Sequence, residues 1–386
     1  MFNKNSRIAI YGDDNFAVGI IDKIAMYGKN AVSFIISERE KALNFYNSYS
    51  LDVAVSEHRN EYDVILIVEE MPFVEDKIYN LYLAGVDEIY ILIKESPIIF
   101  DENYYLSESA IQYFSLKNKP VMRYVEFQLV DDCNLKCKGC THFSNICTSE
   151  DRNAIQLEKL EQQMMHLKRL CDVSVIRMMG GEPLLYPYIK EAVGIVRKHF
   201  IKSRIFIVTN GLLLTKLDKE TCSALADNNV FINISPYTPT LLKCEEIENF
   251  LVDNNVIHFW GNGEKLDEVQ EIKEFHTCLS LKNDNINGYT TCYNKYCWFL
   301  RNNQISKCCY PLLIDLLNKK MNLHFLVNSQ YDAVDLSQCN NGWDLIKFLN
   351  GPIPFCKYCS TSTVNFKWEG GHSTATAIAN DYVIDL

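Results

Sequence analysis

Short apolar runs alternate with longer amphipathic stretches over the first 110 residues of the chain. The runs cover residues 7–11, 31–36, 64–68 and 88–93. Between them, residues 16–28 and 73–85 have apolar positions at helical spacing, and each stretch closes with a glycine. Strands that alternate with helices predict βαβ units, and such units imply a parallel sheet.

A second alternation begins near Pro120, after residues 111–120 (IQYFSLKNKP), which have the composition of a linker. Strands are predicted near residues 124–130, 173–179, 204–209, 230–235 and 255–260, with helical segments at 155–171 and 188–200. Repeated βα units favour a barrel or partial barrel with its chemistry at the carboxyl ends of the strands. Core positions are expected for Met164, Met165, Met178 and Met179, because methionine fills irregular gaps.

The composition is that of a globular protein with more than one domain. A chain of 386 residues is too long for one ordinary core, so two or three domains are expected. No apolar stretch approaches the ~20 residues that span a bilayer. Asp13 and Asp14 interrupt any signal-peptide h-region, so we expect a cytoplasmic protein without membrane contact. The net charge of −11 argues against nucleic acid as a partner.

Cysteine is the residue type that carries chemistry here. The chain has 15 cysteines, and in the cytoplasm these are expected as ligands rather than as disulfides. Three of them follow a predicted strand in the pattern Cys133-x3-Cys137-x2-Cys140. Three clustered thiolates can hold three irons of a four-iron cluster and leave the fourth iron open to another ligand. The alternatives are a structural zinc site or three unrelated cysteines.

The segment CNLKCKGC resembles the signature of the radical S-adenosylmethionine (radical SAM) superfamily. The resemblance implies a [4Fe-4S] cluster on Cys133, Cys137 and Cys140, whose open iron binds the methionine moiety of S-adenosylmethionine. It also implies reductive cleavage of that cofactor to a 5′-deoxyadenosyl radical, with an electron from a reductant such as flavodoxin or ferredoxin. These three cysteines are therefore the expected catalytic and metal-binding residues.

Three later segments agree with this resemblance in order and spacing. Gly180-Gly181-Glu182-Pro183 resembles the superfamily's GGEP motif, which holds the methionine amino group. Glycines let backbone approach a ligand closely, and a carboxylate suits an ammonium group. The runs RIFIVTNG and VFINISPY place Asn210, Ser235 and Tyr237 where the superfamily has further cofactor contacts. The resemblance covers about residues 120–260 and implies a partial (βα)6 barrel.

Eight cysteines follow in residues 271–386, which is too many for core packing alone. Cys292-x10-Asn303-x4-Cys308, with Cys356-x2-Cys359 after it, resembles the C-terminal auxiliary-cluster modules of radical SAM enzymes, called SPASM with two clusters and twitch with one. Asn303 replaces the glycine of that pattern. No further cysteine-rich run follows, so one auxiliary [4Fe-4S] cluster is expected.

The sequence does not decide which cysteines bind the metal of this second site. Cys297 could replace Cys292, Cys309 could replace Cys308, and the same cysteines could bind zinc instead. Cys244 and Cys278 could lie near the barrel mouth, where a thiol could donate hydrogen to a substrate radical. The unassigned Cys147, Cys171 and Cys222 are expected to be small core or surface residues.

The pattern of the N-terminal part resembles the small Rossmann-like domains on proteins of bacterial sugar and polysaccharide biosynthesis. Its nucleotide fingerprint is poor, because Gly12 is the only glycine of G-x-G-x-x-G that is present. Asp14 stands where pyrophosphate would approach, and its charge would repel phosphate. We therefore expect a scaffold or docking domain that does not bind NAD.

The sequence thus predicts an α/β protein with three domains. These are a Rossmann-like domain at 1–115, a radical SAM partial barrel at 120–270 and a twitch/SPASM-like module at 271–386. GCTHFSN looks like radical SAM proteins of bacterial glycan-biosynthesis type, and the module resembles that of dehydrogenases of aminocyclitol antibiotic biosynthesis. We expect a dehydrogenase or epimerase that acts on a small sugar-like or cyclitol-like substrate. The alternatives are a maturase of a ribosomal peptide and an Fe–S electron-transfer or sensor protein.

Overall fold

The computed structural model of the chain forms two compact units, Met1–Arg123 and Tyr124–Leu386. The description that follows covers residues 3–12, 15–37, 46–68, 74–92, 100–107, 110–117, 119–261, 269–281, 288–289, 291–292, 294, 296–323, 329–372 and 375–385.

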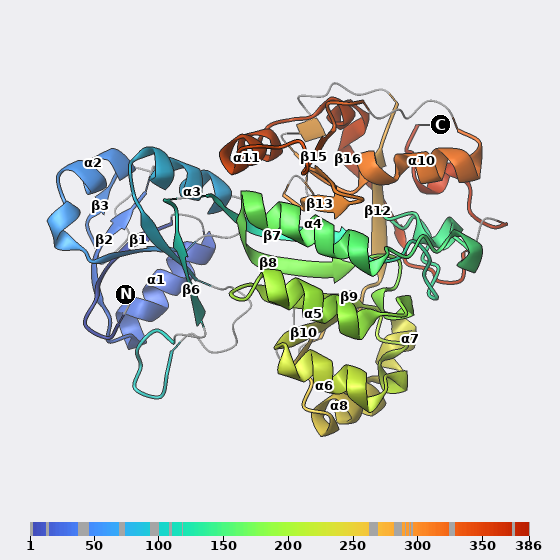
Figure 1. Ribbon diagram of the computed structural model, residues 1–386, viewed down its shortest axis with the longest axis horizontal. Helices are drawn as coiled ribbons and strands as arrows, with labels where there is room; N and C mark the ends of the chain where they lie inside the picture. The colour runs from blue at the N-terminus through green and yellow to red at the C-terminus, as the bar shows by residue number, and fades with distance from the viewer. Residues whose placement is uncertain are drawn as a thin grey trace. The chain divides into compact units, whose positions relative to one another are not determined.

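The first unit is a six-stranded sheet flanked by helices (Figure 1). Its elements are β1 (Arg7–Tyr11), α1 (Asn15–Tyr27), β2 (Ala31–Ile36), β3 (Ser48–Tyr49), α2 (Leu51–Ser56), η1 (Arg59–Glu61), β4 (Val64–Ile67), α3 (Val74–Leu83), β5 (Glu88–Leu92) and β6 (Ile111–Ser115). The strand order is β3-β2-β1-β4-β5-β6, and the pairs from β3 to β5 are parallel. The predicted parallel α/β sheet is confirmed, with the strand order typical of a doubly wound fold.

Gly12 follows β1 at the centre of this sheet. A Cβ atom on Gly12 would lie 1.7 Å from the carbonyl oxygen of Val68. The glycine is therefore required by the close passage of backbone beside β4, and this requirement involves no nucleotide. Asp13 and Asp14, on which the NAD prediction depends, lie outside the described residues.

The predicted linker at residues 111–120 is wrong in its first half. Ile111–Ser115 form β6, which pairs antiparallel with β5 at the edge of the sheet. Gln112 and Phe114 are buried, and Ile111, Tyr113 and Ser115 are half-buried. This alternation is the pattern of an edge strand, and only five residues carry it before a polar stretch.

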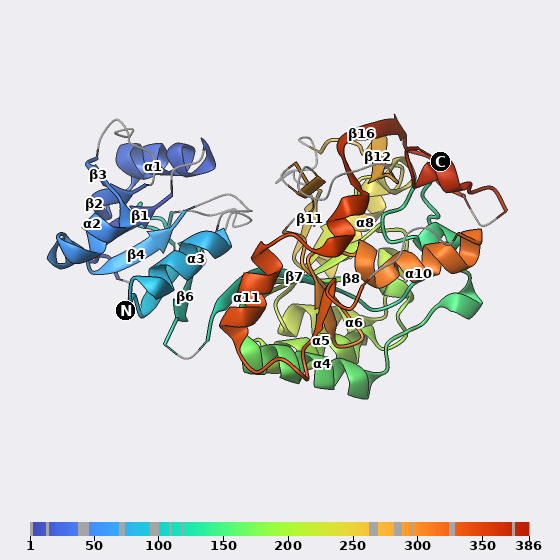
Figure 2. The ribbon, with the colours of Figure 1, turned by 90° about the horizontal axis from the view of Figure 1, so that it is seen from above.

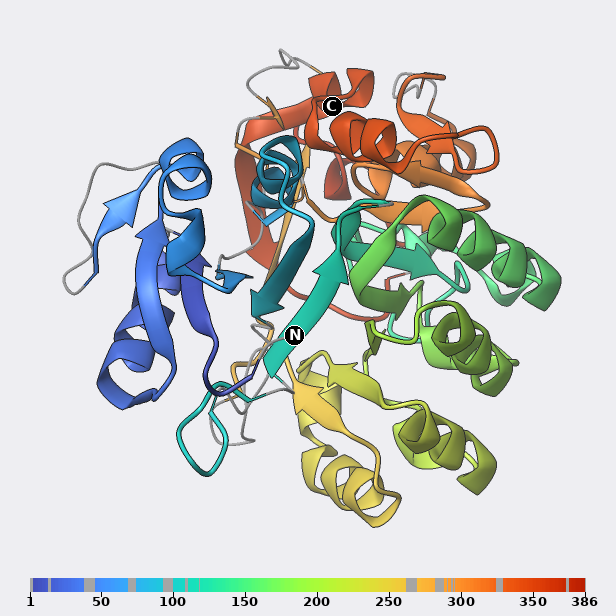
Figure 3. The same cartoon turned by 60° about the vertical axis from the view of Figure 1, so that its left-hand side comes forward.

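The second unit is built on an eight-stranded sheet in the order β11-β10-β9-β8-β7-β13-β14-β15. Its first part contains β7 (Val121–Gln128), η3 (Ser144–Ile146), η4 (Ser149–Asp151), α4 (Leu157–Leu170), β8 (Asp172–Met179), η5 (Pro183–Leu185), α5 (Ile189–His199), β9 (Arg204–Thr209), η6 (Leu214–Lys216), α6 (Lys219–Asp227), β10 (Val230–Ile234), α7 (Thr238–Leu241), α8 (Cys244–Asp253) and β11 (His258–Trp260). The helices α4, α5, α6 and α8 lie over one face of the sheet (Figures 1 and 3).

The cysteine-rich part continues the same unit. It contains β12 (Glu274–Leu279), β13 (Phe299–Arg301), β14 (Gln304–Ser306), α10 (Tyr310–Met321), β15 (Ala333–Asp335), α11 (Gly342–Asn350), η8 (Pro354–Tyr358), β16 (Cys359–Lys367) and η9 (Ala379–Asp381). β13 pairs in parallel with β7, so this part extends the sheet across the predicted boundary at 270/271. β12 pairs with β16 in a separate two-stranded sheet (Figure 2), and the predicted (βα)6 count stays a prediction.

The two faces of the large sheet differ in chemistry. One set of alternating positions is aliphatic and buried, and includes Ile176, Ile207 and Ile232. The other set carries Arg177, whose guanidinium carbon lies 5.8 Å from the ring centroid of Phe206, and Phe206 in turn stacks on Phe231 at 5.2 Å. This face therefore combines charge with aromatic surface, whereas the other face is aliphatic.

The helices of the second unit are amphipathic. α4 buries Leu160, Met164 and Leu167 and leaves Met165 49% exposed. The predicted burial of Met164 and Met178 is confirmed, Met179 is half-buried, and the prediction for Met165 is wrong because that residue lies beside the buried stripe. In the described parts of the chain, no helix has the length and apolar character needed to cross a membrane.

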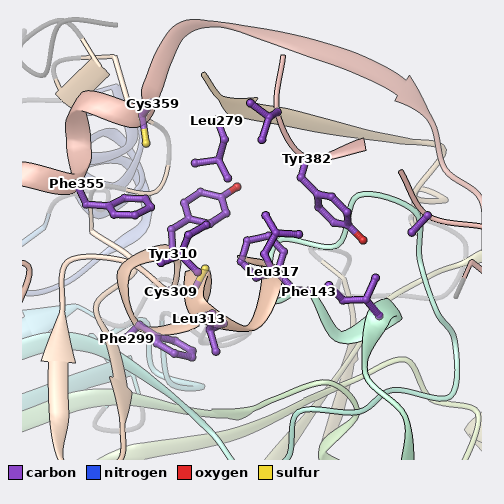
Figure 4. Close-up of a cluster of buried hydrophobic side chains, with 14 of the residues drawn as sticks. Phe143, Leu279, Phe299, Cys309, Tyr310, Leu313, Leu317, Phe355, Cys359 and Tyr382 are labelled. Carbon is purple, nitrogen blue, oxygen red and sulfur yellow. The ribbon is translucent and has the colours of Figure 1, made fainter. Parts of the chain in front are cut away.

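An apolar core lies among the elements of the cysteine-rich part (Figure 4). Phe143 and Tyr382 meet edge to face at 5.5 Å, and Tyr310 and Leu313 of α10 pack against them. Cys309 and Cys359 also belong to this core. The packing of α10 thus brings residues near position 143 together with residues beyond position 350.

β7 carries a buried acid into the sheet. Glu126 is 6% exposed, and the hydroxyl of Tyr124 donates a hydrogen bond to its Oε2 at 2.7 Å. Burial raises the pKa of Glu126 to about 7, against the opposing effects of the Tyr124 hydrogen bond and the Arg177 charge.

This pKa predicts how stability depends on pH. Between about pH 4.5 and pH 7 the unfolded chain releases the Glu126 proton while the folded chain keeps it, so the stability that this group contributes falls as pH rises. Glu126→Gln should remove this dependence, and the variant should gain stability relative to wild type across that range. Urea unfolding at a series of pH values measures this. Glu220→Gln, at an exposed position, is the control; equal pH slopes for wild type and Glu126→Gln would contradict the prediction.

Candidate active site

The loop after β7 and the loop after β8 lie against each other with no side chain between them. The N–H of Gly181 donates to the carbonyl of Val130 at 2.8 Å, and that of Glu182 donates to the carbonyl of Asp132 at 3.0 Å. A Cβ atom on Gly181 would lie 1.9 Å from the Asp132 oxygen, and one on Gly180 would lie 2.6 Å from the Val130 oxygen. In the structure these glycines therefore permit close contact between two backbone segments, whereas the sequence suggested contact with a ligand.

Glu182 connects this contact to the next strand. Its side chain is fully buried, and its Oε1 accepts from the N–H of Leu184 at 3.0 Å and from the hydroxyl of Thr209 at 2.6 Å. Its Oε2 accepts from the N–H of Asn210 at 2.9 Å. Burial raises the pKa of Glu182 to about 7, although all three donors favour the charged form. The predicted contact with the methionine amino group stays a prediction, as does that of the buried Pro183, which begins η5.

Cys133, Cys137 and Cys140 lie on the loop between β7 and η3, where donors are directed at their sulfurs. The N–H of Leu135 donates to Sγ of Cys133 at 3.4 Å. The backbone N–H groups of residues 142–144 oppose the effect of burial on the pKa of the Cys140 thiol. Burial nevertheless raises the pKa of Cys133 to about 12, so a thiolate there needs a positive partner. Three unpaired thiols with directed N–H donors fit an iron–sulfur cluster.

The ends of β9 and β10 bring further predicted residues to this loop. Nδ2 of Asn210 donates to Oδ1 of Asn134 at 2.7 Å and to Sγ of Cys133 at 3.7 Å. The pKa of Tyr237 is raised by burial and then by the charges of the three cysteines, which places its hydroxyl near them. The N–H of Ser235 donates to the carbonyl of Thr209 at 2.8 Å and so holds the two strand ends together.

A cavity of about 430 Å³ opens beside Cys133. Its charged lining consists of Asp132, Lys136 and Arg152. Nε of Arg152 donates to Oδ1 of Asp132 at 3.1 Å, and the Lys136 ammonium donates to the carbonyls of Ser144 and Cys147. A cavity of this volume suits a small molecule. Arg152 was not predicted, because it lies on an irregular segment at no fixed spacing from the cysteines.

A buried ion pair fixes the start of the cysteine loop. The carboxylate of Asp131 is 1% exposed and accepts from Arg301 at 2.6 Å, from Asn153 at 2.7 Å and from Gln128 at 2.5 Å. Arg301 belongs to β13, so the cysteine-rich part of the unit holds this loop in place. Breaking one buried pair of this kind typically costs about 3–5 kcal/mol.

A second group of cysteines assembles around another small cavity. Cys292, Cys308, Cys356 and Cys359 line it, and Cys278 of β12 precedes Leu279, which pairs with Cys359, so the Cys359 thiol lowers the pKa of Cys278. Burial raises the pKa of Cys308, and the charges of Cys292, Cys356 and Cys278 raise it further. We call these five residues the second cysteine group. Cys278 was not among the expected ligands, since it lies outside the spaced pattern that identified the other four.

A buried cation accompanies this group. Lys307 is 2% exposed, its ammonium donates to the carbonyl of Leu349, and it lies 4.7 Å from the ring centroid of Tyr289. Its charge opposes the effect of burial on the pKa values of Cys292 and Cys356. Ligand thiolates would place negative charge beside this ammonium, so the group fits a second cluster.

The other cysteines occupy different places. In the described part of the chain, the second cavity is not lined by Cys297 or Cys309. Sγ of Cys309 donates to the carbonyl of Thr141 at 3.6 Å, and the pKa of Cys297 is raised to about 12 by burial and by Glu126. Cys147, Cys171 and Cys222 are buried, and Cys244 begins α8. Within the described ranges, no three or more Cys, His, Asp or Glu side chains are arranged to hold a single metal ion.

Comparison with known proteins adds two relatives. The chain is 33% identical over 106 residues to a protein named GTP 3′,8-cyclase from Peptoclostridium acidaminophilum, a match that covers 27% of this chain and 31% of that protein. It is 24% identical over 261 residues to the GTP 3′,8-cyclase of Campylobacter fetus subsp. fetus (strain 82-40), covering 62% of this chain and 76% of that protein. The chain thus spans about a third of the length of the first relative.

Among solved structures, the chain is similar to BtrN in complex with AdoMet and 2-DOIA, with 15% identity and a TM-score of 0.35. That similarity covers 60% of this chain and 88% of BtrN. Residues 127–250, which contain the three loop cysteines, Glu182, Asn210 and Tyr237, match the model of the Radical SAM superfamily. The chain therefore contains a radical SAM domain, whose cofactors are a [4Fe-4S] cluster and S-adenosylmethionine.

Proposed function

We propose that the chain is a radical SAM dehydrogenase or epimerase that acts on a sugar-like or cyclitol-like substrate. The observation that carries this proposal is the assembly of two separate groups of buried and half-buried thiols within one unit, one of them beside a 430 Å³ cavity. An enzyme that removes a hydrogen atom and then an electron from its substrate needs two such redox sites.

In this proposal Cys133, Cys137 and Cys140 bind the first cluster, and residues 180–183 with Asn210, Ser235 and Tyr237 surround S-adenosylmethionine. When bound, these cofactors supply the carbon radical that removes a hydrogen atom from the substrate. Asn210 orients the loop through Asn134 and Cys133. Glu182 fixes the end of β9 from which Asn210 projects.

The second cysteine group would hold one auxiliary [4Fe-4S] cluster of twitch type. Four of its five thiols suffice as ligands, and Lys307 offsets part of their negative charge. A ketone product requires an electron acceptor, which this group would provide. An epimer requires a hydrogen donor instead, and Cys244 at the start of α8 is the candidate thiol.

A second candidate substrate is a nucleotide, because both relatives described above are named GTP 3′,8-cyclase. The charged lining of the cavity includes Lys136 and Arg152, which suits either a phosphorylated or a hydroxylated ligand. The first unit would act as a Rossmann-like scaffold in both cases. A flavodoxin or ferredoxin would supply the electron for the first cluster.

Cofactor cleavage is the first expected outcome. Anaerobically reconstituted protein with a low-potential reductant should convert S-adenosylmethionine into 5′-deoxyadenosine, measured by liquid chromatography. The variant Cys133→Ala/Cys137→Ala/Cys140→Ala should form none, since it lacks the ligands of the first cluster. Cys171→Ala, at a buried position outside both groups, is the control for packing. Equal product from wild type and the triple variant would contradict the proposal.

Iron content tests the second cysteine group. About eight irons per chain are expected, four in each group. The triple alanine variant should keep about four. Cys308→Ala/Cys356→Ala/Cys359→Ala, which leaves only two thiols in the second cysteine group, should also reduce the content to about four. Cys297→Ser should keep all eight, because Cys297 does not line the second cavity in the described structure. Retention of eight irons by Cys308→Ala/Cys356→Ala/Cys359→Ala, or zinc in place of iron, would contradict an auxiliary cluster.

The substrate class is tested by label transfer. Deuterium on a hydroxyl-bearing carbon of a sugar or nucleotide-sugar should appear in 5′-deoxyadenosine, detected by mass spectrometry. The parallel reactions contain GTP and a peptide encoded beside the gene. Transfer from GTP alone would favour the nucleotide candidate, and transfer from the peptide alone would show that the substrate class proposed here is wrong.

A further inference from the structure

Residues 366–372 comprise the last two residues of β16 and the five residues after it. They run beside the loop that carries the three cysteines of the first group. The N–H of Lys138 donates to the carbonyl of Glu369 at 2.9 Å. In return, the N–H of Gly371 donates to the carbonyl of Leu135 at 3.0 Å, and that of His372 donates to the carbonyl of Lys136 at 2.8 Å. Three backbone hydrogen bonds therefore join the two segments, as in a short piece of sheet.

Side chains reinforce this pairing. Gly139 has φ +61°, and a Cβ atom there would lie 2.4 Å from the ring of Phe366. The ammonium of Lys138 lies 3.7 Å from Oδ1 of Asp381. The hydroxyl of Tyr382 and the amide of Asn145 exchange hydrogen bonds at 2.7 and 3.0 Å. The cysteine loop and the residues that follow it are therefore in contact with the part of the chain between residues 366 and 382.

Trp368 is the part of this segment that reaches the cysteines. Its ring stacks on Tyr237 with centroids 5.1 Å apart and an interplanar angle of 25°. Its Nε1 is buried and, among the described residues, has no acceptor in full hydrogen-bond geometry. The backbone bond from Lys138 to Glu369 brings the preceding residues, Cys137 and Trp368, close together, and the indole N–H opposes the effect of burial on the pKa of the Cys137 thiol. A buried donor beside a ligand sulfur calls for a negative partner.

We propose that residues 366–372 complete the first cluster site and that Trp368 is a positioning residue whose indole N–H hydrogen-bonds the Cys137 sulfur when the cluster is bound. The inference rests on the proposed assignment of a cluster to Cys133, Cys137 and Cys140. Hydrogen bonds to cluster sulfurs favour the reduced state, which carries more negative charge, and so raise the reduction potential. The tail of the chain would in this way set the potential of a cluster bound more than 200 residues earlier.

Trp368→Phe tests the donor. Phenylalanine keeps an aromatic ring beside Tyr237 and lacks only the N–H, so the first cluster should still load at about four irons. Its reduction potential, followed by electron paramagnetic resonance in a variant whose second group is disabled by Cys308→Ala/Cys356→Ala/Cys359→Ala, should shift to a lower value. Trp343→Phe, on α11, is the control and should leave the potential unchanged. A loaded cluster with the wild-type potential in Trp368→Phe would overturn the inference.

Gly139→Ala tests the pairing of the two segments. The added methyl group would collide with Phe366, so the C-terminal segment should become more sensitive to protease and the potential should shift in the same direction. Gly194→Ala, where a Cβ meets no atom within 4 Å, is the control. In Gly139→Ala/Trp368→Phe the two shifts should not add, because both remove the same donor; full additivity would overturn the inference. A wild-type chain that binds no cluster would instead refute the proposed function.

Discussion

The carboxyl ends of β7 and β8 approach each other so closely that only glycine fits between them, and the rest of the site follows from this contact. Gly181 lies against the carbonyl of Asp132, so the next residue, Glu182, enters the protein interior. There its carboxylate meets Thr209 and Asn210 at the end of β9. Asn210 in turn reaches Cys133. One backbone contact therefore sets the relative positions of three strand ends and the cysteine loop.

Buried charge is the second theme of this unit. Thiols with pKa values raised by burial, two acids with pKa values near 7 and an almost inaccessible Lys307 lie within a single fold. In a chain built only for stability, apolar residues would serve better at most of these positions. Such groups are retained where a bound cofactor completes the electrostatic balance. The carboxyl groups of Glu126 and Glu182 accept hydrogen bonds from other groups of the chain, which offset part of the cost of their burial. The thiols receive only weak hydrogen bonds from N–H groups.

The sequence predicted those features that depend on local pattern. The strands β1, β2, β4, β5 and β7 to β11 were predicted from apolar runs bounded by polar or turn residues, whereas β3 and β13 to β15 have only two or three residues and were not. The first cysteine site was predicted because its three cysteines lie within eight residues. β6 was missed because only Gln112 and Phe114 are buried in it, one of them polar. Cys278 and Trp368 were missed because each meets its partners through tertiary contacts that no spacing in the sequence reveals.

The pairing of residues 135–138 with residues 369–372 also has a consequence for how the protein is made. About 230 residues separate Lys138 from Glu369, and at 5–20 residues per second a ribosome needs roughly 10–50 s to synthesise them. Throughout that interval the three thiols have emerged, while the segment that covers them does not yet exist. Cluster insertion into a finished site therefore has to wait for residues 366–372, and the nascent thiols must be kept reduced until that segment has been made.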